Sequence, residues 1–316
     1  MRFFSKNKDL SGWMAIALQP DGVCLAHVER SSQGRYTLER TAFYPGTNAA
    51  DAASLEKMGK ELRANRYRWT NLLSLNEYQL LSVDAPNVAP DELKTAIRWR
   101  LKDMLDYHID DATVDVLDVP AEKNSRARNH AMYAVAAHNQ IIERRQSLFG
   151  DAKLPISVID IPEMAQRNIA ALAEPEGRGL AMLSLQSECA LLTITFAAEL
   201  YLSRRIDVSL SQLAEGDEEQ KTACYERISQ EVQRSLDHFD RQYHFVTMSK
   251  LVIAPLGDVG GDLPAYLSDS LDIAVETLEL GSVLNIAKVP ELKSPQMQQR
   301  YFMAIGAAMR HEVKTL

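Results

Sequence analysis

Residues that could perform acid–base, nucleophilic or metal chemistry are scattered along this sequence rather than grouped. His238 and His244 lie six residues apart, whereas two metal ligands on one helix face need a spacing of four. Asp110 and Asp111 fall where a helix is expected to end, while acid–base catalysis needs a desolvated cleft. The motifs GxSxG, HExxH, GxGxxG and the P-loop are absent. We therefore predict no catalytic residue and no metal site, and we expect the protein not to be an enzyme.

The composition and charge indicate a globular protein and argue against nucleic-acid binding, secretion and a membrane span. The chain has 316 residues, 46% of them hydrophobic and 25% charged, which is typical of a globular chain with two or three domains. The net charge of −8 offers no basic surface for nucleic acid. Cys24, Cys189 and Cys224 have no CxxC spacing, so we expect buried thiols in a reducing compartment. The basic start at residues 1–9 leads into no long apolar run, so we predict neither a secretory signal nor a membrane span.

The elements that would position a site begin with three strands, at residues 13–18, 23–30 and 36–44. Asp21-Gly22 separates the first two, and Asp-Gly is a strong hairpin signal. Leu55, Met58 and Leu62 recur at helical spacing, and a strand is expected at 71–75. The same order returns about 167 residues later. The second set comprises strands at 180–185, 190–196 and 200–206, a long helix carrying Tyr225 to Phe239, and a strand at 251–255.

This architectural repetition predicts two paired α/β lobes that face a cleft, as in the actin, hexokinase and Hsp70 superfamily. An insert interrupts the first half, with strands at 78–85, 113–119 and 131–137 and helices at 91–105 and 139–149. Residues 122–130 are expected to form its hairpin tip, and the glycine- and proline-rich stretch 174–179 the boundary between halves. We assign 1–76 and 154–174 to the first lobe, 77–153 to the inserted subdomain, and 175–316 to the second lobe, whose upper part is reduced to 210–221.

In such a fold a nucleotide would lie between the hairpin tips of the two lobes. Phosphate-binding tips need Gly, Ser or Thr so that backbone amides approach the anion, and an acidic residue to organise magnesium. Here Pro20 has no N–H to donate, and Glu188 places a negative charge in a tip without glycine. The candidate nucleotide contacts are thus weak or vestigial ones: Gln19, Asp21, Gly22, Gln186, Ser187, Gly257, Gly260 and Gly261.

Short motifs follow one another in a specific order from the insert to the end of the chain. They are Asp84-Ala85-Pro86, the run 91–97 with Trp99, the run 158–163 leading into 169–172, Glu231 with 234–236, and Tyr301 with 304–308. In this order they resemble the PilM-like proteins of type IV pilus assembly, in particular the MshI branch of MSHA-type pili. The resemblance covers nearly the whole chain.

The resemblance implies an actin-like (ribonuclease H-like) duplicated fold with a small β/α insert subdomain, as in PilM and the division protein FtsA. It implies a cytoplasmic protein at the inner face of the inner membrane that docks the N-terminal tail of a PilN-like partner, MshJ-like in this branch, alongside other pilus assembly components. ATP with magnesium is the family's ligand. The family's Asp-x-Gly-Ser tip is missing here, and Asp207 follows Ile206 where the family has Gly-Gly. We therefore expect a degenerate ATPase homologue that acts as a scaffold.

Three basic residues of the insert helix, Arg98, Arg100 and Lys102, are candidate contacts for acidic residues of the partner, although an ordinary solvated face would look the same. Two other functions stay open. One is an ATPase of the PilM type with unusual phosphate loops. The other is the cytoplasmic part of a GspL-like type II secretion protein; that family continues into a membrane span, whereas this sequence stops at residues 314–316, and we expect the free-standing type.

Overall fold

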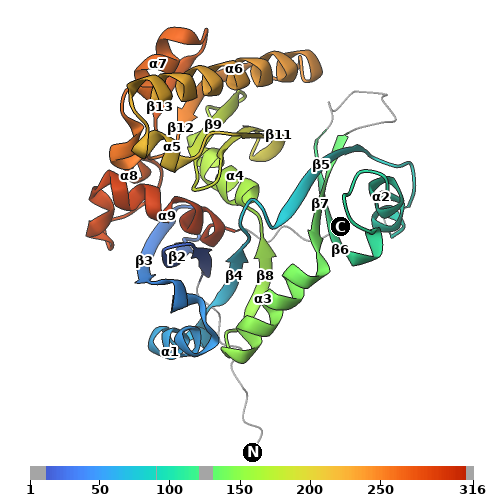
Figure 1. The fold of residues 1–316 in the computed structure, drawn as a ribbon, viewed down its shortest axis with the longest axis vertical. Helices are drawn as coiled ribbons and strands as arrows, with labels where there is room; N and C mark the ends of the chain where they lie inside the picture. The colour runs from blue at the N-terminus through green and yellow to red at the C-terminus, as the bar shows by residue number, and fades with distance from the viewer. Residues whose placement is uncertain (1–11, 90, 121–130, 311–316) are drawn as a thin grey trace, which may run out of the picture.

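A computed structural model describes residues 12–89, 91–120 and 131–310. The predicted N-terminal segment 1–9, the hairpin tip at 122–130 and the chain end at 314–316 lie outside these residues. The described part forms two five-stranded sheets and one three-stranded sheet. Figure 1 shows the second lobe with α6 and α7 at one end of the molecule, the first lobe with α1 at the other, and the insert at the side.

The two large sheets have the same topology, which confirms the predicted duplication. The first has the order β3-β2-β1-β4-β8 and the second β11-β10-β9-β12-β13. In each, the central strand runs antiparallel to its hairpin partner and parallel to the strand that follows the helix. The strands are β1 Trp13–Gln19, β2 Gly22–Arg30, β3 Tyr36–Pro45, β4 Arg68–Leu72, β8 Ile156–Asp160, β9 Gly179–Leu185, β10 Ala190–Phe196, β11 Glu199–Ile206, β12 Met248–Ile253 and β13 Ala274–Thr277.

The insert is an antiparallel sheet of order β5-β7-β6, and the helices α2 and α3 both contact it. Its strands are β5 Tyr78–Asp84, β6 Ala112–Asp118 and β7 Ala131–His138. Ile97 and Leu101 of α2 pack on Met132 and Ala134 of β7. The helix predicted at 91–105 is shorter in the structure, where α2 runs Leu93–Leu101 and a turn follows. The helix α3 Asn139–Asp151 leaves the insert and places Phe149 in the outer core of the first lobe.

Each lobe ends in a helix that packs on the other lobe's sheet. The helix α4 Pro162–Ala173 follows β8 of the first sheet but lies against β9, β10 and β11, while α9 Pro295–Ala308 follows the second lobe and lies against β1 and β2. The two helices also pack on each other. Apolar side chains cover nearly the whole circumference of α9 from Tyr301 to Ala308, as expected for a helix enclosed on all sides. This exchange makes the core continuous between the lobes.

Separate helices cover the outer faces of the two sheets. The helix α1 Ala52–Leu62 places Leu55 and Met58 on the first sheet, and the helix α6 Glu218–Gln242 places Ile228 and Val232 on the second. The strand predicted at 71–75 lies earlier in the chain, at Arg68–Leu72, and residues 73–75 are not part of it. Its start includes Trp69, whose side chain is buried and whose Nε1–H donates to the Ala64 carbonyl at 2.8 Å. The remaining helices are α5 Leu210–Glu215, α7 Leu263–Ser270 and α8 Leu280–Val283. No helix of the described ranges is both long and apolar enough to cross a membrane.

Candidate functional site

A cavity of about 580 Å³ lies between the hairpin tips of the two lobes, with α9 as one wall. Four candidate nucleotide contacts line it, Gln19 and Asp21 from the β1–β2 tip and Gln186 and Ser187 from the β9–β10 tip. The structure therefore brings these four predicted residues together at one cavity. Most other lining side chains are apolar: Leu18, Leu72, Leu73, Leu75, Leu185, Leu210, Met297 and Met303.

The first tip is bound to α9. The Asp21 carboxylate is 2.7 Å from the Arg300 guanidinium, which also lies 4.1 Å from the centroid of the Phe43 ring. Gln19 Nε2 donates to the Arg300 carbonyl at 3.4 Å, and the buried Cys24 Sγ donates to Gln19 Oε1 at 3.1 Å. The acidic group that would organise magnesium is thus paired with a side chain of the same chain.

The second tip is held by hydrogen bonds as well. Asn76 Nδ2 donates to the Glu188 carboxylate at 2.9 Å, and Gln186 Nε2 donates to Ser184 Oγ at 3.1 Å. The backbone carbonyl of Gln186 accepts from the Leu210 N–H at 2.9 Å. Because no glycine is present, the backbone amides of this tip have no special freedom to surround a phosphate.

The remaining candidate glycines do not line the cavity, and packing explains two of them. A Cβ on Gly257 would lie 2.6 Å from Gln299 Oε1 and 3.2 Å from the Cα of Gln296 in α9. A Cβ on Gly22 would lie 2.2 Å from the Tyr44 carbonyl oxygen of β3. Gly260 and Gly261 belong to the same turn as Gly257 or border it. Gly22 and Gly257 thus allow a close approach of β3 and α9, and none of the four glycines lines the cavity.

The donor set of the cavity does not fit a magnesium triphosphate. Arg300 is the one basic side chain among the residues that line it, and it is engaged by Asp21. Glu188 adds a negative charge at the mouth, and Pro20 lacks an N–H. Elsewhere in the described residues no group of three or more His, Cys, Asp or Glu side chains could hold a metal ion. Burial raises the pKa of the Cys24 thiol to about 12, so this thiol is not a nucleophile at neutral pH.

Sequence reasoning missed a polar cluster behind the cavity wall. Glu163, in the first turn of α4, is completely buried and accepts hydrogen bonds from Tyr78 of β5 and from Arg205 Nη2 of β11, the latter at 3.4 Å. The Arg205 guanidinium carbon also lies 4.6 Å from the centroid of the Tyr78 ring. Burial raises the pKa of Glu163 above its usual value despite these partners. One sequence feature could have indicated this cluster: Glu163 and Gln166 lie three residues apart, on a helix face that is otherwise apolar.

The buried amide of Gln166 fastens α4 to the second sheet. Its Nε2 donates to the Met182 carbonyl at 2.8 Å and to Thr193 Oγ1 at 2.9 Å, and its Oε1 accepts from Ser184 Oγ at 2.5 Å. Because Ser184 in turn accepts from Gln186 of the second tip, the position of that tip is linked to the position of α4.

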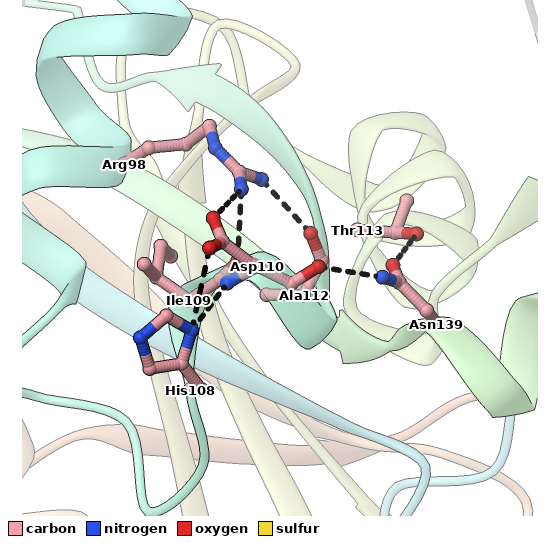
Figure 2. Close-up of polar contacts among 7 residues, drawn as sticks. All are labelled: Arg98, His108, Ile109, Asp110, Ala112, Thr113 and Asn139. Carbon is pink, nitrogen blue, oxygen red and sulfur yellow. Dashed lines mark hydrogen bonds and ion pairs between the residues drawn. The ribbon is translucent and has the colours of Figure 1, made fainter.

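The basic residues proposed for the partner are not equally free. Arg98 donates to the carbonyls of Ile109 and Ala112, both at 2.9 Å, and lies 3.6 Å from Asp110 (Figure 2). In the same network Asn139 Nδ2 donates to the Asp110 carbonyl at 2.9 Å. Arg100 Nη1 donates to the Asp84 carbonyl at 2.8 Å. Arg98 therefore connects α2 to the start of β6, whereas Lys102 is exposed on the surface.

The large hydrophobic side chains that are exposed in the described residues all belong to the insert. Trp99 of α2 is 71% exposed, Met104 45% and Val88 40%. In the sequence Trp99 was noted only as part of a motif, and its exposure was not predicted. At the other side of the insert, half-buried apolar side chains from β5, β7, α3 and β8 pack against the core shared by the lobes: Leu80, Val135, Ile141 and Ile159.

Comparison with known proteins yields structural likeness only. No family model and no curated protein matches the sequence. A chain of the PilM–PilN type IV pilus biogenesis complex superposes with a TM-score of 0.73 at 17% identity, covering 95% of this chain and 98% of that chain. The cytoplasmic domain of EpsL, an inner membrane component of the type II secretion system of Vibrio cholerae, gives a TM-score of 0.43 at 15% identity, over 66% of this chain and 76% of its own.

A Bacteroides thetaiotaomicron protein described as having an actin-like ATPase fold gives a TM-score of 0.48 at 10% identity, over 93% of this chain and 99% of its own. The two matching sheets, the crossed helices α4 and α9, and the near-complete overlap with the chain from the PilM–PilN complex agree with one another. The protein therefore has the duplicated actin-like fold, with the insert between β4 and β8.

Proposed function

We propose that this protein is a PilM-type scaffold of type IV pilus assembly, which docks the N-terminal tail of a PilN-like inner-membrane protein from the cytoplasmic side. The observation that supports this most is the likeness to a chain of the PilM–PilN complex, which extends over 95% of the protein and thus includes the insert. The order of the sequence motifs supports the MshI branch and an MshJ-like partner within this proposal.

Scaffolding without ATP turnover agrees best with the chemistry of the cleft. Asp21 is paired with Arg300, Glu188 is held by Asn76, and the one glycine of the two tips, Gly22, does not line the cavity. Binding of a triphosphate would require both acidic groups to be neutralised or displaced, which costs free energy before any contact with the ligand forms. We infer a pseudo-ATPase.

The junction of the insert with the first lobe is the place where we expect the partner tail to dock. Within the residues that the structure describes, β8 is an edge strand, so one side of its backbone has no strand partner there. An extended peptide can add to such an edge through main-chain hydrogen bonds, while adjacent pockets take its side chains. Val158 and Ile159 of β8 and Ile141 of α3 are half-buried and apolar. They suit a tail with alternating apolar residues.

Binding of a fluorescent peptide with the sequence of the partner's N-terminal tail tests this proposal. Fluorescence anisotropy with the full chain should give the same Kd with and without millimolar ATP and magnesium. Ile159→Thr should weaken binding about tenfold, which corresponds to about 1.4 kcal/mol. The matched control is Val275→Thr, because Val275 is a half-buried residue of β13, the corresponding edge strand of the second sheet. Its Kd should be unchanged.

Each outcome bears on a different part of the proposal. Absence of peptide binding refutes the docking function. Binding that requires ATP, or thermal stabilisation of the protein by ATP alone, refutes a cleft that excludes nucleotide, because any ligand of the native state must stabilise it. Hydrolysis of that ATP refutes the pseudo-ATPase and supports an ATPase of the PilM type. Equal loss of affinity in the Ile159 and Val275 variants refutes docking at β8.

A further inference from the structure

Three parts of the molecule meet at the buried cluster of Tyr78, Glu163 and Arg205. Tyr78 is the first residue of β5 in the insert, Glu163 belongs to the crossed helix α4, and Arg205 lies near the end of β11, the edge strand of the second sheet. Arg205 also donates to the carbonyls of Leu75 and Tyr78. The insert is thus connected to the second lobe, although it is inserted in the first.

A second contact joins the same two parts. Tyr133 of β7 donates its hydroxyl hydrogen to the Tyr201 carbonyl at 3.3 Å and accepts from the Ser203 N–H at 3.1 Å. Both partners belong to β11. Tyr133 is almost completely buried, so these hydrogen bonds are shielded from water. The two contacts fix the orientation of the insert against the edge of the second sheet.

The cluster also reaches the wall of the cleft. Leu75 and Pro162 line the cavity between the hairpin tips. The Leu75 carbonyl accepts from Arg205, and Pro162 directly precedes Glu163. Movement of Arg205 or Glu163 therefore moves residues that shape the cavity. Asn76, next to Leu75, bonds Glu188 of the second tip, which extends the connection across the cleft.

We propose that the Tyr78–Glu163–Arg205 cluster is a latch that couples the insert to the interlobe cleft. A buried carboxylate that loses its partners is strongly unfavourable, so the three residues separate together or not at all. Such an all-or-none contact turns a small displacement of one part into a displacement of the others. Because the proposed docking site lies where the insert joins the first lobe, beside β8, the latch transmits partner binding to the cleft; this regulatory role rests on the proposed function.

Hydrogen–deuterium exchange of the full chain tests the latch without any ligand. In Tyr78→Phe and Glu163→Gln, exchange should rise about tenfold both in β5 and in the cleft segments 72–76 and 186–188, since a hydrogen bond to a charged group contributes on this scale. Glu199→Gln is the matched control, because Glu199 pairs with Arg167 at 3.3 Å and so links the same α4 and β11 without touching the insert. Faster exchange confined to β5, or an equal effect in the control, overturns the proposal.

Adding the partner-tail peptide tests transmission. The peptide should change exchange at 186–188 in the wild type, while in Glu163→Gln it should still bind but leave exchange at 186–188 unchanged. Binding that leaves residues 186–188 of the wild type unaffected refutes the latch and leaves the docking function intact. Failure of the peptide to bind the wild type refutes the docking function instead, and the ligand-free comparison still decides whether the cluster acts as one unit.

Discussion

The crossing of α4 and α9 can be tested at Gly306, the point where the two helix backbones touch. A Cβ at this position would lie 2.2 Å from the carbonyl oxygen of Ala165 and 2.7 Å from its carbonyl carbon, whereas real Cβ contacts stay beyond 3.0 Å. Both atoms are backbone, so no side-chain rotation can relieve the overlap. The Gly306 carbonyl also accepts a hydrogen bond from Asn168 Nδ2 at 2.9 Å. Gly306→Ala must therefore separate the helices.

Two effects of opposite sign set the magnitude for Gly306→Ala. Overpacking in a rigid core costs about 1–3 kcal/mol. Here the new Cβ would overlap the backbone of the neighbouring helix, which cannot rotate away, so we expect a cost at the upper end of this range. Replacing glycine by alanine inside a helix returns about 1 kcal/mol. The net change in the free energy of unfolding should thus be about 2 kcal/mol of destabilisation. Since α4 and α9 each pack on the opposite lobe's sheet, both lobes should lose stability together.

Urea denaturation followed by far-UV circular dichroism measures this change. Gly150→Ala is the matched control, because Gly150 is also helical and a Cβ there meets no atom within 4 Å. The control should be stabilised by about 0.5–1 kcal/mol through helix propensity alone. If Gly306→Ala is as stable as the wild type or more stable, the close approach of the two helices, and with it the continuous interlobe core, is refuted.

Three further predictions concern polar contacts. Burial raises the pKa of Glu163, so the native state retains a proton that the unfolded chain has lost; the stability of the wild type relative to Glu163→Gln should therefore fall as pH rises through weakly acidic values, as thermal melts would record. Arg98→Ala removes two hydrogen bonds and should destabilise the insert by about 1–3 kcal/mol. Lys102 is exposed, so Lys102→Ala should change the stability by no more than about 0.5 kcal/mol. Hydrogen–deuterium exchange in α2 and β6 should therefore become faster in the Arg98 variant and stay unchanged in the Lys102 variant. Asp21→Asn should cost less than about 1 kcal/mol in a urea titration, because that ion pair is half exposed.

Much of the fold was predictable because its elements have strong local patterns. The Asp-Gly signal correctly predicted a tight hairpin between β1 and β2, but its two-residue loop is Pro20-Asp21, because Gly22 already belongs to β2 and pairs with Gln19. The long apolar face of α6 identified a helix that covers a sheet. The exchange of α4 and α9 between lobes had no local signal, because periodicity shows which face of a helix is apolar and not which sheet it faces. One part of this arrangement does have a sequence signal. The apolar run after Tyr301 indicates a helix that is enclosed on nearly all sides, as α9 is.

The site was predictable only in part, for a similar reason. The tips converge because strands of one topology end at the same edge, so Gln19 and Ser187 share a cavity. The partners of these groups are distant in sequence. Asp21 meets Arg300 279 residues later, and Glu163 meets Tyr78 85 residues earlier. Gly257 shows a second reason why the site was hard to predict. A sequence does not distinguish a glycine that lets a helix approach closely from a glycine in a phosphate-binding loop.

Contacts within the chain join the two lobes across the cleft. In a nucleotide-bridged cleft the ligand contacts both lobes, whereas here α9 performs that role, through Arg300 to Asp21 in the first lobe and through Gln296 to Asp258 in the second. Beside it, the Leu38 N–H donates to the Asn285 carbonyl at 2.9 Å, and the Asn285 N–H donates to the Tyr36 carbonyl at 3.0 Å. Since protein groups already satisfy both sides of the cleft, a nucleotide would have to replace these contacts rather than complete them. These contacts hold the two lobes together as one frame for the insert, as the proposed scaffold function would require.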